Sequence, residues 1–155
     1  MNDSLRYFFG SQADYYTGVA EDLDEGKTRF NEGAFFFGMF WMAYRKMYAN
    51  AAITFAIIMA ESALEDWLIP EASKTFVYSL VSNVLIASVI GFAGNRLYIN
   101  FARKRVAAIA SNISELTDPE AIAQLRKQGG VSWLGPLVVL AAFIILVAGT
   151  FYLTM

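Results

Sequence analysis

Three long apolar stretches constrain this chain more than any other feature of its sequence. They cover residues 49–69, 75–93 and 134–153, and the last of them contains no charged residue. Each approaches the roughly 20 apolar residues with which a helix crosses a hydrocarbon core about 30 Å thick. The sequence therefore predicts an all-α integral membrane protein with three transmembrane helices.

The composition favours the same conclusion. Of the 155 residues, 57% are hydrophobic and 17% are charged, and the mean hydropathy is +0.43. Soluble domains average roughly 45–50% apolar residues and about 25% charged residues. A chain of this length leaves too much surface in water to hide such a surplus in its own core. We therefore expect a lipid bilayer to cover it.

The basic residues predict the orientation. Of the twelve Lys and Arg residues, all except Lys74 lie on one side of the predicted spans, and such residues near span ends favour the cytoplasmic side. We expect a cytoplasmic N-terminus and a periplasmic C-terminus. Residues 1–33 contain no apolar run typical of a signal peptide, so an inner or cytoplasmic membrane is the expected compartment.

An aromatic stretch precedes the first span. Residues 34–44 would form a helix only about 16 Å long, too short to cross a bilayer, so we expect an interfacial or a re-entrant helix. The predicted segments are then an acidic cytoplasmic segment (1–33), the aromatic helix (34–48), a two-span hairpin with a basic inner extension (49–110), a cytoplasmic helix with a Gly-Gly hinge (111–130) and the third transmembrane helix (131–155).

Short cytoplasmic amphipathic helices are expected between the second and third spans. Thr117-x-x-Glu120 matches a capping box, Pro119 falls in the first turn, and Gly129-Gly130 ends the predicted helix. Upstream of this helix, four apolar residues recur at helical spacing on one face: Val106, Ile109, Ile113 and Leu116.

Polar residues also follow helical spacing within the spans. Asn50, Thr54 and Glu61 share one face of the first predicted helix. A seam of small and polar residues recurs every fourth position in the second: Ser79, Asn83, Ala87, Gly91 and Asn95. Packed against each other in a tight hairpin, the two faces would keep their polar groups away from lipid, and helix packing alone explains such a pattern.

A functional reading of the same face centres on Glu61, because an ionisable residue inside a membrane is a functional candidate. Glu61 lies about 9 Å inside Trp67 at helical rise, with Glu65 one turn further out and Asn83 as its expected neighbour. Alternatively, the helix ends early and these carboxylates lie among headgroups. The candidate intramembrane polar site comprises Asn50, Thr54, Glu61, Glu65, Ser79 and Asn83.

The chain contains neither Cys nor His. Their absence removes thiolate catalysis, zinc sites built from these ligands, and imidazole acid–base chemistry. No serine of the predicted spans has a basic partner at comparable depth. We expect no enzymatic activity, no cofactor and no metal. The basic triplet at residues 103–105 lacks the broader basic face typical of nucleic-acid binding, so we expect no nucleic-acid partner.

Two motifs resemble a known family. The run FNEGAFFFGMFWMAYRKMY at residues 30–48 and the run GFAGNRLYINFARKRVAAI at residues 91–109 are similar to segments of small bacterial membrane proteins classed as domain of unknown function 2628. Tyr15-Tyr16 matches the N-terminal aromatic pair of that family, and the resemblance covers residues 14–110. It implies a bacterial inner-membrane setting, and the family supplies no activity, cofactor or catalytic residue to carry over. Met39 replaces a usual proline, which favours a smooth helix through Gly38.

The motif positions of this resemblance form a candidate inner-leaflet module. The basic pair Arg45-Lys46 and the pair Asn95-Arg96 lie at the same face of neighbouring predicted helices. We therefore expect the aromatic helix to dock on the inner end of the second span, with Asn95 bridging the junction. The module comprises Phe30, Asn31, Phe35, Gly38, Trp41, Tyr44, Arg45, Lys46, Tyr48, Gly91, Asn95, Arg96 and Tyr98, with Tyr44 and Tyr98 closing the junction.

Two hypotheses for function follow. In the first, this is a small polytopic inner-membrane protein that acts non-enzymatically by binding a membrane partner, as a regulator, accessory, defence or immunity protein. In the second, it forms a homo-oligomeric channel or transporter that uses Glu61 and Asn83. Three spans are few for a pathway within one copy, so the second hypothesis requires oligomers.

Overall fold

The computed structural model describes residues 2–71, 75–111 and 118–154, and every regular element within these ranges is helical. The predicted all-α class is confirmed. The elements are α1 (Asn2–Phe9), the 3-10 turn η1 (Gly10–Gln12), α2 (Ala13–Asp24), α3 (Glu32–Tyr44), α4 (Tyr48–Leu68), α5 (Phe76–Ala110), α6 (Pro119–Gln128) and α7 (Leu134–Thr154).

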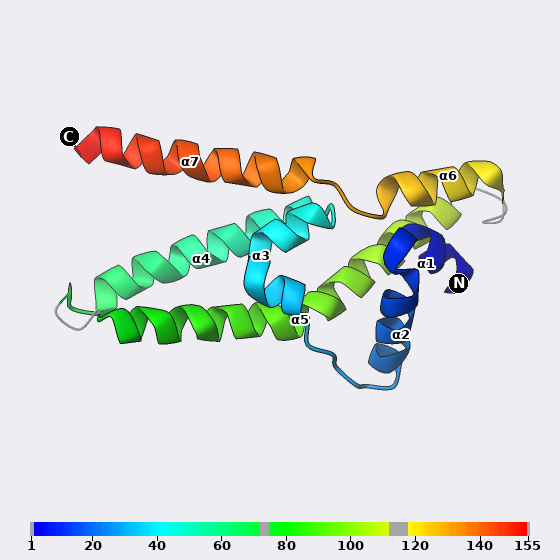
Figure 1. The fold of residues 1–155 in the computed structure, drawn as a ribbon, viewed down its shortest axis with the longest axis horizontal. Helices are drawn as coiled ribbons and strands as arrows, with labels where there is room; N and C mark the ends of the chain where they lie inside the picture. Colours follow the sequence, from blue (N-terminus) through cyan, green and yellow to red (C-terminus); the bar gives the residue numbers. More distant parts are fainter. Residues whose placement is uncertain (1, 72–74, 112–117, 155) are drawn as a thin grey trace.

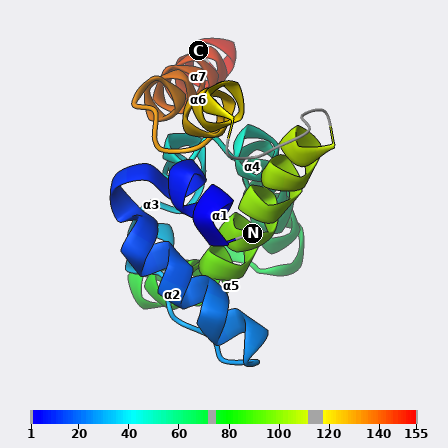
Figure 2. The ribbon, with the colours of Figure 1, turned by 90° about the vertical axis from the view of Figure 1, so that its right-hand side faces the viewer.

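The helices divide into a head and three helices that leave it on the same side (Figure 1). We call head the assembly of α1, η1, α2, α3, α6 and the C-terminal half of α5, whose members contact one another. The view along the long axis shows α1 lying against the C-terminal half of α5 (Figure 2). The helices α4 and α7 and the N-terminal half of α5 extend away from this head.

An aromatic cluster forms the centre of the head. Tyr98 of α5 is fully buried, and its ring centroid lies 4.6 Å from that of Tyr16 and 5.7 Å from that of Phe9. Trp41 of α3 approaches the same tyrosine at 6.0 Å. Aromatic pairs contribute about 0.5–1.5 kcal/mol each beyond the area that they bury. This cluster therefore holds α1, α2 and α3 to α5.

The N-terminal segment contributes to this core. The acidic composition of the segment gave no indication that it would be buried. Its buried apolar residues are Leu5, Phe8, Phe9, Tyr16, Val19 and Ala20. The chain turns at Gly10, where φ is 63°, so the two helices bury different faces and no single period runs through the segment. The acidic side chains face outward, and Asp24 pairs with Arg103 of α5 at 2.7 Å.

The helix α3 is kinked at Gly38. The backbone there has φ 47° and ψ −120°, outside the helical region, and glycine adopts positive φ without steric cost. The expected smooth helix through Gly38 and Met39 is therefore wrong. The missing proline does not straighten α3, because the glycine itself supplies the break.

The sequence predicted a tight hairpin of α4 and α5. In the structure the two helices do not pack closely along their whole length. At the head end, α3 lies between the two helices and contacts both (Figure 1). A Cβ on Gly91 would lie 2.5 Å from the Phe30 ring, and one on Gly94 would lie 2.5 Å from the Cβ of Ala34. The inner half of the small-residue seam thus receives α3 and Phe30 instead of α4.

The helix α6 is capped by Asp118, whose carboxylate accepts a hydrogen bond from the Glu120 amide at 3.1 Å. The expected Gly-Gly hinge is held against α1: the Gly130 amide donates to the Phe8 carbonyl at 2.8 Å, and a Cβ on Gly129 would collide with that carbonyl. Three residues of the predicted cytoplasmic patterns lie outside the described residues: Ile113, Leu116 and Thr117.

Within the described residues, α5 alone is both long and apolar enough to cross a membrane by length and composition. Only 6% of its most apolar window is buried, unlike the core helix of a soluble protein. The described apolar part of α7 is Leu134–Gly149, which is shorter. Three transmembrane helices therefore stay a prediction.

Candidate functional site

The predicted docking of the aromatic helix on α5 is present, and Asn31 forms its centre. Asn31 caps α3, because its Oδ1 accepts a hydrogen bond from the Ala34 amide at 2.7 Å. Its Nδ2 donates to Oδ1 of Asn95 at 2.7 Å, and its backbone amide donates to the Gly91 carbonyl at 2.9 Å. One buried side chain therefore starts α3 and fixes it to α5.

Asn95 extends this junction to the N-terminal helices. It is 1% exposed, and its Nδ2 donates to the Arg29 carbonyl at 3.1 Å and to the Tyr15 hydroxyl at 3.3 Å. A buried amide that lost these partners would be left unsatisfied at a cost of about 1–3 kcal/mol. The bridging role expected of Asn95 agrees with this geometry.

Arg45 lies beside the junction with its charge unpaired. The residue is 4% exposed, and within the described residues its guanidinium forms no ion pair and donates to the neutral amide oxygen of Gln12. The Tyr16 and Tyr98 hydroxyls also interact with it. Its Nε and Nη1 have no hydrogen-bond partner. The guanidinium carbon lies 4.7 Å from the ring centroid of Tyr16, 5.2 Å from that of Tyr98 and 5.8 Å from that of Tyr44.

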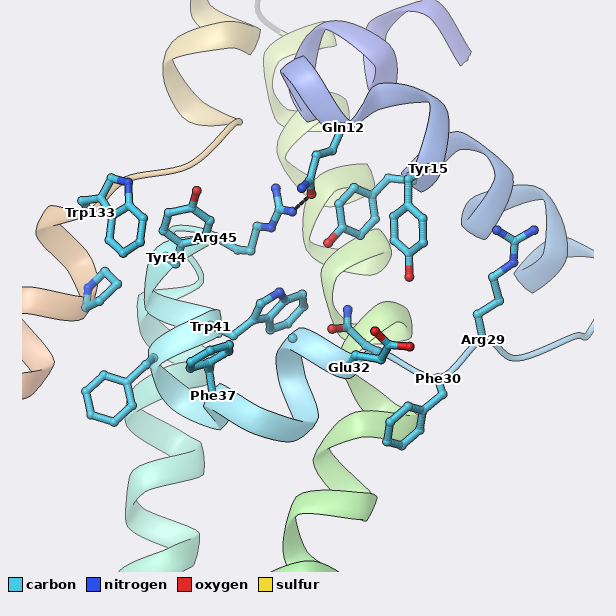
Figure 3. Close-up of a pocket in the computed structure, with 15 residues that line it drawn as sticks. Gln12, Tyr15, Arg29, Phe30, Glu32, Phe37, Trp41, Tyr44, Arg45 and Trp133 are labelled. Atoms are coloured by element: carbon cyan, nitrogen blue, oxygen red, sulfur yellow. Dashed lines mark hydrogen bonds between the residues drawn. The ribbon is translucent and has the colours of Figure 1, made fainter.

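A cavity of about 880 Å³ opens next to this arginine. Figure 3 shows Gln12 and Arg45 at its head side, the rings of Phe37 and Trp41 on the opposite side, and Trp133 beside Tyr44. The cavity therefore combines a polar end with an aromatic end, an arrangement typical of small-molecule sites.

Two other charged groups line the cavity. Arg29 is ion-paired with Asp22, so its charge is compensated, and Glu32 is exposed at the cavity's edge. Burial raises the pKa of the Tyr16 phenol above 10.0, while the positive charge of Arg45 opposes that shift. Arg45 is thus the cation of this site that no carboxylate neutralises among the described residues.

Lys46 links the aromatic helix to α6. It has φ 60°, and its Nζ donates to the carbonyl oxygens of Lys127 at 2.9 Å and Gly129 at 2.5 Å. Burial lowers the pKa of this ammonium. A cation at the C-terminal end of a helix is favourable for the helix dipole, so Lys46 stabilises α6 besides carrying one of the charges that predicted the orientation.

The remaining residues of the predicted module are only partly brought together. Tyr44 does not close the junction with Tyr98 as expected, because its ring packs on Trp133 at 4.9 Å. Phe30 and Phe35 contact each other at 5.4 Å. Two further members, Tyr48 and Arg96, are exposed.

The predicted intramembrane site is rearranged. Glu61 and Glu65 both accept from the Ser82 hydroxyl, at 3.2 and 2.7 Å, and Glu65 also accepts from Tyr78 at 2.8 Å. Asn83 is not their neighbour: it is exposed and donates to the Ser79 carbonyl of its own helix.

The polar residues near the head end of α4 are separate from these carboxylates. The Thr54 hydroxyl contacts the Met42 sulfur at 3.3 Å, whereas Asn50 is half-buried. The predicted polar face of α4 therefore divides between α3 and α5 and does not face one partner helix.

A groove that the sequence did not indicate lies between α4 and α7. It has a volume of about 650 Å³. Its lining is apolar apart from the Tyr48 hydroxyl and includes several small residues: Ala51, Ala52, Gly135 and Ala142. The start of α7 packs closely on α3, since a Cβ on Gly135 would collide with the Ala43 carbonyl. Beyond that contact the groove stays open.

These features define a helical protein in which a kinked aromatic helix is docked on one long helix through two buried asparagines. The chain belongs to the family described as protein of unknown function (DUF2628), which matches residues 13–104. The match includes the Asn31–Asn95 junction and Arg45, and it confirms the resemblance read from the motifs. No curated protein and no solved structure matches the chain.

Sequence reasoning missed Gln12 and Trp133 at the cavity. Both come from segments outside the two motifs, and neither carries a local signal of a binding site. The Tyr15-Tyr16 pair carried a signal of burial, because two adjacent aromatics in an otherwise polar helix indicate that one of them is buried. Tyr16 is that residue.

Proposed function

We propose that this chain is a three-span membrane protein that acts without catalysis by binding a membrane-protein partner. The proposed spans are α4, the N-terminal half of α5, and α7. The helices α4 and α7 have 21 residues each, or about 31 Å at helical rise, close to a hydrocarbon thickness of about 30 Å. Their large apolar side chains are exposed along most of their length.

The charge distribution supports a cytoplasmic head. In this arrangement every Lys and Arg except Lys74 belongs to the head, to the connections between its helices or to the ends of helices that enter it. Such an excess of basic residues favours the cytoplasmic side. The proposed orientation is a cytoplasmic N-terminus and a C-terminus on the other side, in a bacterial inner membrane.

The observation that carries the binding proposal is the apolar groove between α4 and α7. Small residues on both of its walls allow a helix backbone to approach closely, as at known helix–helix contacts in membranes. The groove runs along proposed spans, where a partner must be apolar and must satisfy its own backbone hydrogen bonds. We propose a transmembrane helix of another protein as its occupant.

The chain itself suits the test, because it contains no cysteine. Ala52→Cys and Ala142→Cys place a thiol-reactive photo-crosslinker in the groove, and Leu85→Cys and Val89→Cys place it on exposed surface of α5. We expect one discrete adduct from both groove positions, with a mass equal to the stoichiometric complex purified in mild detergent. An absent adduct, or the same adduct from the α5 controls, would contradict the proposal.

A homo-oligomeric channel is the second candidate. Its support is the exposed face of α5 that carries Ser79 and Asn83, polar groups that neighbouring copies would cover in an assembly. The mass in detergent separates the candidates: a symmetric oligomer without another protein favours the channel, and one copy bound to a different chain favours partner binding.

A further inference from the structure

We propose that the cavity beside Arg45 binds the anionic phosphate headgroup of a membrane lipid. The inference uses the membrane placement proposed above, but it does not depend on the partner groove between α4 and α7. It assigns a ligand class to a site on the head side of the cavity, formed by Gln12, Tyr16 and Arg45.

The first argument is the uncompensated charge. A buried cation is costly unless a partner neutralises it. Arg45 is 4% exposed, yet the groups that its guanidinium meets among the described residues are neutral: the Gln12 amide oxygen and the Tyr16 and Tyr98 hydroxyls. Its Nε and Nη1 have no well-formed hydrogen bond. An anionic oxygen entering from the cavity supplies the acceptor that the chain itself does not. Arginine suits phosphate because its planar fork can bind two oxygens.

The second argument is the position of the rings. The three tyrosines that approach the guanidinium, at 4.7 to 5.8 Å, hold it by cation–π contacts. An aromatic cage without a cation inside it would attract a cationic ligand. Here the cage is already filled by Arg45, so the charge presented to the cavity is positive. The ligand is therefore an anion.

The third argument is that the cavity is apolar at the end opposite Arg45. A ligand that fills both ends must therefore be amphiphilic. Phe37 of α3 and Pro136 of α7 line the apolar end, and Trp133, the residue before α7, lies beside Tyr44. In the proposed membrane placement this end faces the inner leaflet, where Trp residues lie at headgroup level. A volume of about 880 Å³ accommodates a headgroup together with the first carbons of its chains. Glu32 at the edge is exposed and lies apart from Arg45 (Figure 3).

Gln12 provides a test that leaves the fold intact. In Gln12→Glu, the new carboxylate takes the place of the lipid phosphate beside Arg45, so that the variant should fold at least as stably and lose the lipid. Gln124→Glu is the matched control, because it introduces the same charge on α6 away from the cavity. Thermal unfolding in detergent verifies that both variants are folded.

Trp41 provides the readout, since it lines the cavity and is largely buried. The chain has three Trp residues, so Trp67→Phe with Trp133→Phe leaves Trp41 alone. Brominated phosphatidylglycerol should quench its fluorescence at a concentration at least about tenfold lower than brominated phosphatidylcholine does, since one charged contact to a buried arginine is worth that factor or more. The preference should persist in Gln124→Glu and disappear in Gln12→Glu.

Three results would overturn the inference: equal quenching by the two lipids, a preference that survives Gln12→Glu, or full protection of Trp41 by inorganic phosphate at the lipid's own concentration. The last result would assign the site to a free anion instead of a lipid. The test is also separate from that of the partner groove. Loss of the groove adduct with intact lipid preference would contradict partner binding alone, and the reverse would contradict the lipid site alone.

Discussion

Asn31 and Asn95 meet through a hydrogen bond of 2.7 Å although 64 positions separate them in the chain. Asn31 begins α3, and Asn95 lies where α5 enters the head. Both side chains are nearly fully buried, so each depends on the other to satisfy its amide. This pair therefore sets how the aromatic helix sits on α5, and through α3 it sets the wall of the cavity.

Removing one member of this pair should destabilise the head. We expect Asn95→Ala to lower the free energy of unfolding by about 1–3 kcal/mol, because the Asn31 amide is left buried without its acceptor. Asn100→Ala, an exposed asparagine of the same helix, is the control. Thermal or denaturant unfolding in detergent measures both, and equal stability of the two variants would contradict the role of the pair.

The contact of α3 with α5 should not tolerate a methyl group at Gly94. A Cβ there would lie 2.5 Å from the Cβ of Ala34, and overpacking of this kind costs about 1–3 kcal/mol. Gly149→Ala makes the same change in α7, where nothing lies within 4 Å of the added atom. We expect Gly94→Ala to unfold at lower temperature and Gly149→Ala to match the unmodified chain. The reverse order would contradict the close approach.

The proposed topology can be tested with single cysteines at two exposed positions, Asp3→Cys in α1 and Tyr152→Cys in α7. An impermeant maleimide applied to intact spheroplasts should modify the cysteine at 152 and should reach the cysteine at 3 only after permeabilisation. If both cysteines react from the same side, the number of spans is even and the three-span proposal is wrong.

Burial of Tyr16 predicts a loss of stability in alkali. Its pKa is raised in the folded protein above the unfolded value of 10.0, mainly by burial. The unfolded chain therefore ionises first, so the contribution of this group is fully present below pH 10 and is lost as the pH rises through the folded pKa. We expect Tyr16→Phe to show a shallower decline in unfolding temperature above pH 10. Tyr7→Phe, at an exposed position, should decline like the unmodified chain, and an unchanged slope in Tyr16→Phe would contradict the prediction.

The sequence predicted the helices that depend on long apolar runs and on local capping. The ends of α4 and the start of α7 agree with the predicted stretches to within a residue or two. Docking of α3 on α5 was also predictable, since the pairs Arg45-Lys46 and Asn95-Arg96 were both expected at the same face of neighbouring helices. The packing partners of the small-residue seam in α5 were not predictable, because such a seam permits close approach without specifying which helix approaches. Gly91 and Gly94 accept Phe30 and Ala34 where the first span was expected.

The cavity illustrates the same limit at the level of single side chains. Arg45 was assigned a role in orientation, as basic residues beside a span usually are. Gln12 of η1 and Tyr16 of α2 cover it, and they come from an acidic segment whose amphipathic faces are divided by the turn at Gly10. Composition cannot reveal that an arginine is buried when the residues that bury it lie in a different, weakly patterned part of the chain.

The hydrogen bond between Phe8 and Gly130 joins the first helix to a late part of the chain, which matters for folding during synthesis. The carbonyl of Phe8 accepts the Gly130 amide at 2.8 Å, and the end of α6 is also held by Lys46. Chains emerge from the ribosome N-terminus first, so α1 is synthesised well before the residues that complete its contacts. Phe8 and Phe9 therefore stay incompletely buried until α4, α5 and α6 have all been translated. The N-terminal helix of this protein is therefore fully covered only after α6, near the end of the chain, has been translated.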